Sequence, residues 1–153
     1  MFYIKIAGKI AHKRYIRRYI NDILHHYFKN RIKRFITINI NIVEWLDGDQ
    51  GHCLGTRDHI DIHIATVIGG KRNRKRRPKL DQILETLAHE LIHAKQYLRG
   101  EINQHNLIWR GARGPYDCKC LSYRRTPWEK EAYNQEKDLK IAYWDKQYKQ
   151  LIK

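Results

Sequence analysis

The sequence predicts an α+β fold, because strictly alternating segments lie among stretches in which apolar residues recur with helical spacing. Residues 36–42 and 59–64 alternate isoleucine with polar residues, which is typical of strands with one buried face. Over 9–30, 80–98 and 127–149, apolar residues recur every three or four positions, which is typical of amphipathic helices. We therefore expect an N-terminal helix and a small sheet packed against a central helix, with a C-terminal helix completing the fold.

The size and composition indicate one domain spanning residues 1–153. No apolar run approaches the length of a membrane span, and charge interrupts the N-terminal segment too early for a signal peptide. Cys53, Cys118 and Cys120 are an odd number of cysteines without a disulfide framework, which fits a reducing compartment. We expect a cytoplasmic protein with no membrane partner, located in the host cytoplasm if a phage encodes it.

The predicted central helix carries the pentad His-Glu-Leu-Ile-His at residues 89–93. Positions i and i+4 share a helix face, so His89 and His93 can bind one metal ion together. Glu90 is then placed to take a proton from a water held by that ion, which is the arrangement that a zinc peptidase requires. Gly100 follows the pattern as a C-cap residue. The alternative is that both histidines only decorate a polar helix face.

A catalytic zinc site normally has three protein ligands, so a third residue is required. Thr126 has the features of an N-cap, and Glu129 falls where a capping box would use it. This leaves Glu131, at the border of the apolar stripe of the last helix, as the expected third ligand. His105, in the segment after the central helix, is the alternative ligand.

The second half of the chain resembles the zincin peptidases, and within them small phage-type proteins related to the SprT-like and ImmA/IrrE-like families. The matching positions are residues 89–97, Gly100, Trp109, Gly111 and residues 127–132. The resemblance implies a minimal zincin-like domain that binds Zn²⁺ and hydrolyses peptide bonds. In gluzincin-like relatives the third ligand is a Glu followed by Ala on a later helix, which maps onto Glu131. In SprT-like proteases it is a His with a Trp four residues on, which matches His105 and Trp109. We favour Glu131, because its helix is better defined.

The expected reaction is zinc-dependent hydrolysis of a protein or peptide substrate, with Glu90 as the general base that later protonates the leaving amine. Such a reaction also needs a neutral donor for the oxyanion. Tyr97, Tyr116 and Tyr123 are the candidates in this sequence.

The chain carries a formal net charge of +15, and one run supplies nearly half of it. Its positive residues are Lys71, Arg72, Arg74, Lys75, Arg76, Arg77 and Lys79. Gly69 and Gly70 precede the run and Pro78 interrupts it, which predicts a mobile loop before the central helix. Such a loop can bind DNA or another polyanion through charge, or it can simply be solvated. Two alternative functions therefore stay open: an SprT-like protease acting on DNA-bound proteins, and a non-catalytic basic nucleic-acid-binding protein.

Two further segments have predicted structures that bear on function. In the predicted strand 59–64, His59, Asp61 and His63 share the face opposite the isoleucines, as a possible metal site or an exposed polar face. Because a peptide can add to a sheet as an extra strand, this strand is our expected substrate edge. Residues 101–125 show little periodicity and predict a long loop.

Overall fold

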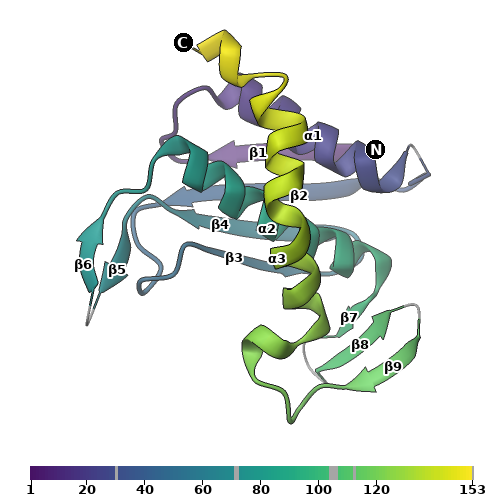
Figure 1. Ribbon diagram of the computed structural model, residues 1–153. Coiled ribbons are helices and arrows are strands. Elements are labelled where there is room, and N and C mark those ends of the chain that lie inside the picture. Colours follow the sequence, from purple (N-terminus) through teal and green to yellow (C-terminus); the bar gives the residue numbers. More distant parts are fainter. Residues whose placement is uncertain (30, 71–72, 104–106, 112, 153) are drawn as a thin grey trace.

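The computed structural model describes residues 1–29, 31–70, 73–103, 107–111 and 113–152, and these form an α+β fold (Figure 1). The expected fold class is therefore confirmed. The described strands are β1 (Phe2–Ala7), β2 (Ile36–Val43), β3 (Gly51–Gly55), β4 (His59–Ala65), β5 (Ile68–Gly70), β6 (Asn73–Arg76), β7 (Ile102–Asn103), β8 (Ile108–Gly111) and β9 (Gly114–Asp117). The described α-helices are α1 (Lys13–Phe28), α2 (Leu80–Arg99) and α3 (Pro127–Lys140). A 3₁₀ turn, Tyr123–Arg125, precedes α3, and a π-helical turn, Ile141–Asp145, continues it.

The main sheet has the strand order β1–β2–β4–β3. Its strands β1, β2 and β4 are parallel, whereas β3 pairs antiparallel with β4 at the edge of the sheet. Ile38 lies beside Ile60 and Ile40 beside Ile62, and all four side chains are fully buried. Period-2 alternation puts successive side chains on opposite faces, so one face of the sheet is apolar, as the sequence predicts.

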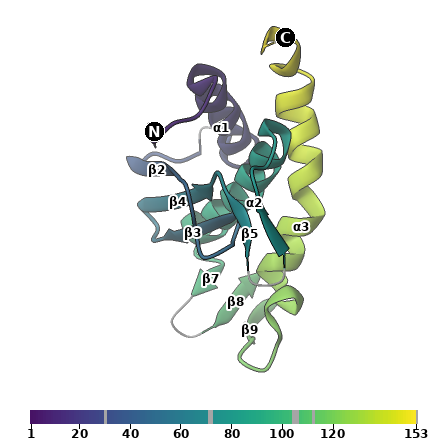
Figure 2. The same ribbon diagram turned by 90° about the vertical axis from the view of Figure 1, so that its left-hand side faces the viewer.

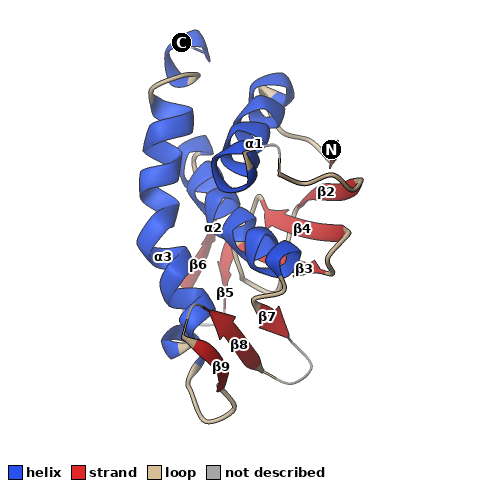
Figure 3. Cartoon of the chain, turned by 90° about the vertical axis from the view of Figure 1, so that its right-hand side faces the viewer, coloured by secondary structure: helices blue, strands red, loops and turns tan. Residues whose placement is uncertain are grey.

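Helices α1 and α2 cover the apolar face of the sheet, and α3 packs against the outer side of α2 (Figures 2 and 3). Because α2 lies between the sheet and α3, it is buried on two sides, and every residue from Leu87 to Leu98 is buried. That burial includes five polar side chains, His89, Glu90, His93, Lys95 and Gln96. Buried polar groups require partners, so the packing of α3 decides how they are satisfied. None of the described helices combines the length and apolar character needed to cross a membrane.

The segment after α3 anchors that helix to α1 and α2. The Trp144 ring is fully buried and meets the ring of Tyr19 edge-on at 5.7 Å between centroids. The hydroxyl of Tyr19 donates to the carbonyl of Leu84 in α2 at 3.0 Å. In the same region, the hydroxyl of Tyr148 donates to the Asp22 carboxylate at 2.6 Å. These contacts hold the far end of α3 and so help to fix the direction in which it crosses α2.

The basic run is partly a β-hairpin, which corrects the expected loop. β6 pairs antiparallel with β5, and the pairing shifts register between Ile68 and Gly70. The Lys75 ammonium lies 4.6 Å from the centre of the Trp45 ring, and Arg77 pairs with Glu44 at 3.3 Å. Backbone pairing and these side-chain contacts hold the described part of the basic run in a defined structure. The Gly, Pro and Lys/Arg composition of the run gives no sign of these contacts. Lys71 and Arg72 lie outside the described residues.

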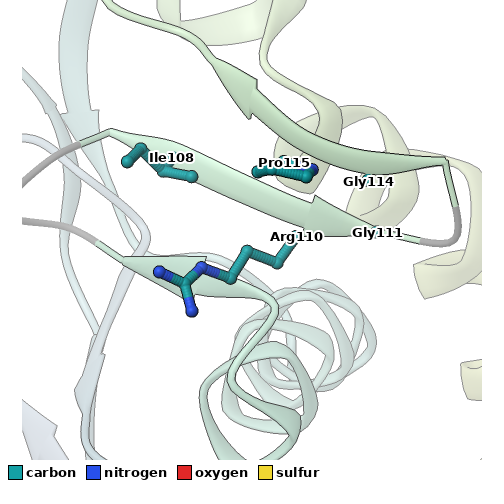
Figure 4. Close-up of a pocket in the computed structure, with 5 residues that line it drawn as sticks. All are labelled: Ile108, Arg110, Gly111, Gly114 and Pro115. Carbon is teal, nitrogen blue, oxygen red and sulfur yellow. The ribbon is translucent and has the colours of Figure 1, made fainter.

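The sequence predicts a long loop between α2 and α3, but this prediction is wrong. The segment contains the small sheet β7–β8–β9. Gly114, with φ of 96°, starts β9 opposite Gly111, and the Trp109 side chain lies against Gly111 where a Cβ would stand. One face of the β8–β9 hairpin carries Ile108, Arg110 and Pro115 (Figure 4). The strands are short and contain glycines, which is why periodicity does not reveal them.

The expected substrate edge is wrong, because β4 is an interior strand with β2 on one side and β3 on the other. The face of β4 away from the helices carries a polar network. There Asp61 accepts from Asn39 Nδ2 at 2.9 Å and pairs with His59 Nε2 at 3.0 Å. The edge strand on the α2 side of the sheet is β3.

Candidate metal centre

His89 and His93 lie one turn apart on α2, on the side that meets α3. Their Nε2 atoms are 3.0 Å apart, and their rings are nearly perpendicular, at 80°. The two residues are only 8% and 7% exposed, because α3 covers them. The i, i+4 spacing of the pentad therefore brings both imidazoles to one buried point.

Glu129, in the first turn of α3, is the third side chain at this point. Its Oε1 lies 3.1 Å from His93 Nε2, and its Oε2 lies 3.3 Å from His89 Nε2. One ligand atom from each of the three residues falls within 4.8 Å of the others. Glu129 is 1% exposed. The buried group of His89, His93 and Glu129, called the triad below, can hold a metal ion.

Outer hydrogen bonds orient both imidazoles. Nδ1 of His89 lies 2.6 Å from the Glu136 carboxylate, and Nδ1 of His93 lies 2.8 Å from Gln96 Oε1. The Gln96 amide orientation follows from its other end, where Nε2 donates to the Trp128 carbonyl at 3.0 Å. Each acceptor requires a proton on Nδ1, which leaves the Nε2 lone pair of a neutral ring for a metal. Carboxylate and amide partners of this kind are the usual supports of metal-binding histidines.

The donor set fits a bound cation. With both Nδ1 atoms protonated, the two neutral rings aim lone pairs at each other across 3.0 Å. Within the described residues, the buried Oε2 of Glu129 has no hydrogen-bond partner. Buried polar atoms are rarely left unsatisfied, and a cation between the three residues satisfies all of these atoms together.

The electrostatics of the triad favour positive charge. Burial opposes ionisation of Glu129, but its interactions with His89 and His93 prevail and lower its pKa to about 2. Burial likewise lowers the pKa of His89, but the carboxylates of Glu129 and Glu136 outweigh it and raise that pKa to about 9. A proton and a metal ion therefore compete for this position.

Glu90 lies beside the triad and against β3. Burial raises its pKa to about 7, although the neighbouring His93 and His89 act to lower it. A Cβ on Gly51 would come within 2.7 Å of Glu90 Oε1 and 2.8 Å of Thr86 Cγ2. The absence of a side chain at Gly51 thus lets Glu90 pack directly against the edge strand.

Glu131, the expected third ligand, is directed elsewhere. Its Oε1 pairs with Lys95 Nζ at 2.6 Å, and its Oε2 accepts from Gln96 Nε2 at 2.7 Å. Lys95 is only 3% exposed and pairs also with Glu101 at 2.9 Å. In this structure Glu131 therefore neutralises a buried cation and steadies Gln96, which in turn orients His93, and Glu129 takes the place beside the two histidines that was expected for Glu131.

The different positions of Glu129 and Glu131 have a geometric cause. Two residues apart on a helix are roughly 200° apart around its axis, so Glu129 and Glu131 lie on opposite flanks of the buried stripe of α3. Glu129 and Glu136, seven residues apart, share one flank to within about 20°. The capping box that had assigned Glu129 to the backbone does not form, because Thr126 Oγ1 donates to the Tyr123 carbonyl at 2.6 Å. The shared flank of Glu129 and Glu136 was the available sequence signal.

The three candidate oxyanion donors occupy different places. Tyr97 is buried in α2, whereas Tyr116 is exposed on β9. Tyr123 is 66% exposed, and burial of its hydroxyl together with interaction with Glu129 raises its pKa. Of the three, Tyr123 therefore combines a hydroxyl that interacts with a triad residue and a side chain that is largely exposed. His105, the alternative ligand, lies outside the described residues.

Comparison with known proteins identifies no family: no family model matches the chain, and no curated protein matches it. The geometry of the triad and its surroundings is therefore the basis for a proposed function.

Proposed function

We propose that this protein is a zinc-dependent peptidase with a zincin-like site. The observation that carries the proposal is the buried triad, with each histidine oriented by its own outer partner. Two imidazoles and one carboxylate are a known ligand set for catalytic zinc. Two nitrogens bound to one tetrahedral zinc ion lie about 3.3 Å apart, close to the 3.0 Å between the two Nε2 atoms.

Each nearby side chain has a proposed task. Zinc held by the triad supplies Lewis-acid chemistry, making water more acidic and polarising a carbonyl. Glu90 accepts the proton of the attacking water and delivers it to the leaving amine. The Tyr123 hydroxyl donates a hydrogen bond to the oxyanion. The edge strand β3, which contacts Glu90 at Gly51, pairs with the extended substrate.

Metal dependence tests this function. The zinc-loaded protein, mixed with peptides from a digested proteome, is expected to generate new termini that mass spectrometry detects. A zinc chelator should abolish the cleavage and added zinc should restore it, because the triad residues act on the substrate only through the bound ion. Cleavage that persists unchanged in chelator would rule out a metallopeptidase.

A polyanion is a second proposed partner, favoured by the hairpin β5–β6. Arg74, Lys75 and Arg76 of β6 and the following Arg77 are exposed, on a chain of net charge +15. Binding through phosphate contacts weakens with salt, with a slope of about 0.9 per contact for duplex DNA. DNA-stimulated cleavage would indicate a DNA-associated protease, and DNA binding without cleavage a nucleic-acid-binding protein.

Replacing Arg74 and Lys75 together with Gln should therefore weaken duplex DNA binding. The dependence of the binding constant on salt should also become less steep, by the amount expected for the loss of about two phosphate contacts. Fluorescence anisotropy at several salt concentrations measures both quantities. Gln at Lys5 and Lys33, which removes the same charge from exposed positions elsewhere, is the control. Equal losses in the two double variants would show that net charge, and not the hairpin, binds DNA.

A further inference from the structure

A surface pocket of about 310 Å³, called the cavity below, is open to solvent beside the first half of α3 and is lined by the exposed side chains of Arg124, Lys130, Tyr133 and Asn134. Arg124 belongs to the 3₁₀ turn that precedes the helix, which lies at the lower end of α3 in Figure 1. Lys130 and Asn134 are one helical turn apart and therefore share a face of α3. All four lining side chains offer hydrogen-bond donors, and two of them are cationic.

This cavity adjoins the triad. The Tyr133 ring that lines it also meets the His89 ring edge-on, with 4.8 Å between centroids. The charge of Arg124 acts on the Tyr133 hydroxyl, where it opposes the rise in pKa that burial and Glu129 cause. One aromatic ring thus separates the two cations of the cavity from a metal-binding histidine.

The two cations of the cavity have no acidic partner within the described residues. Other cations that α3 or α2 brings near carboxylates are paired: Lys95 with Glu131, and Lys140 with Asp145 at 3.2 Å. The two α3 carboxylates that meet the triad histidines, Glu129 and Glu136, are engaged by the imidazoles. The positive charge in the cavity is therefore available to a ligand.

We propose that this cavity is a specificity pocket that binds a carboxylate of the substrate beside the scissile bond. The proposal rests on the proposed peptidase function. Arg124 and Lys130 form charge-assisted hydrogen bonds with the carboxylate, Asn134 donates through its amide, and the Tyr133 ring packs against the adjoining methylenes. The preferred substrates are peptides with an acidic residue near the cleaved bond. A C-terminal carboxylate presents the same chemistry.

The test uses Ala-based peptides with blocked ends and a single Glu, beside identical peptides with Gln, which has the same shape without the charge. A third set has Gln and a free C-terminus, which separates the two sources of the carboxylate. A charge-assisted hydrogen bond is worth about tenfold to hundredfold in affinity. We therefore expect kcat/KM of the zinc-loaded protein to favour one acidic set over the neutral peptides by about that factor.

Variants assign the preference to the cavity. Replacing Arg124 and Lys130 together with Gln should bring the acidic and neutral peptides to similar kcat/KM. Gln at Arg125 and Lys137, two exposed cations that do not line the cavity, removes the same charge and should keep the preference. Equal cleavage of the acidic and neutral sets by the wild type would overturn the pocket and leave the peptidase standing.

Binding separates the pocket from the chemistry. Calorimetry with zinc-loaded Glu90→Gln protein should show the same tenfold or greater preference for the acidic peptides. If the wild type cleaves none of the peptides but this binding preference is observed, the pocket stands and the peptidase function fails. If the acidic and neutral peptides bind equally and nothing is cleaved, both proposals fail.

Discussion

Glu129→Gln is expected to abolish stoichiometric zinc binding, whereas Glu131→Gln should retain about one zinc per chain. Glu129 supplies a carboxylate oxygen to the triad, and an amide is a poor substitute for that charge in a site 1% exposed. Among the described residues, the polar partners of the Glu131 carboxylate are Lys95 and Gln96, outside the triad. Losing such an outer partner typically weakens metal affinity by about 10–100-fold, so saturating zinc still fills the site.

Elemental analysis of dialysed protein measures the zinc content, and thermal unfolding gives a second readout. Zinc at a hundredfold excess over its Kd stabilises the fold by about 2.7 kcal/mol. For a chain of this length that is a rise in Tm of roughly 5–10 °C. Wild type and Glu131→Gln should show this rise, and Glu129→Gln should not. Loss of zinc and of the Tm rise in Glu131→Gln alone would identify Glu131 as the ligand. If both variants keep zinc and the Tm rise, the metal binds elsewhere.

Glu90→Gln is expected to keep the zinc and its Tm shift but lower kcat by about a hundredfold to ten-thousandfold. Glu90 lies outside the triad, so metal binding does not need its charge. Gln has nearly the same shape, so packing against Gly51 is preserved while the proton acceptor is lost.

The measurement for Glu90 is single-turnover cleavage of a peptide identified with the wild type. Glu85→Gln, another carboxylate on α2 that is not in the triad, is the matched control and should cleave normally. An unchanged rate in Glu90→Gln would remove Glu90 as the general base. A loss of zinc in the same variant would mean that the residue acts on the metal site itself.

The local patterns that the sequence carries were sufficient for the central elements. Alternating isoleucines identified β2 and β4 and their buried face, and helical spacing identified α2 up to its C-cap, Gly100. The same spacing brought His89 and His93 together, because residues i and i+4 of a helix are neighbours whatever the rest of the chain does. Each of these features depends on residues close together in the sequence.

The third side chain of the triad depends on contacts between distant segments and was decided by the tertiary structure. Glu129 and Glu131 are both glutamates near the buried stripe of α3, and only the direction in which α3 crosses α2 selects between the two flanks. That direction is set in part by Trp144 against Tyr19, more than a hundred residues apart in the chain. The buried charge of Lys95 then holds Glu131.

The edge of the sheet was decided in the same way. A strand pattern reports which face is buried but not which strand lies next to which, since strand order is a property of the assembled sheet. β3 is short and has a glycine at each end, so its sequence gives little sign that it borders Glu90. The amino-acid sequence alone therefore determined the helix that carries two of the three triad residues. The packing of α3 and β3 around that helix decided the third, because those contacts join residues that the chain keeps far apart.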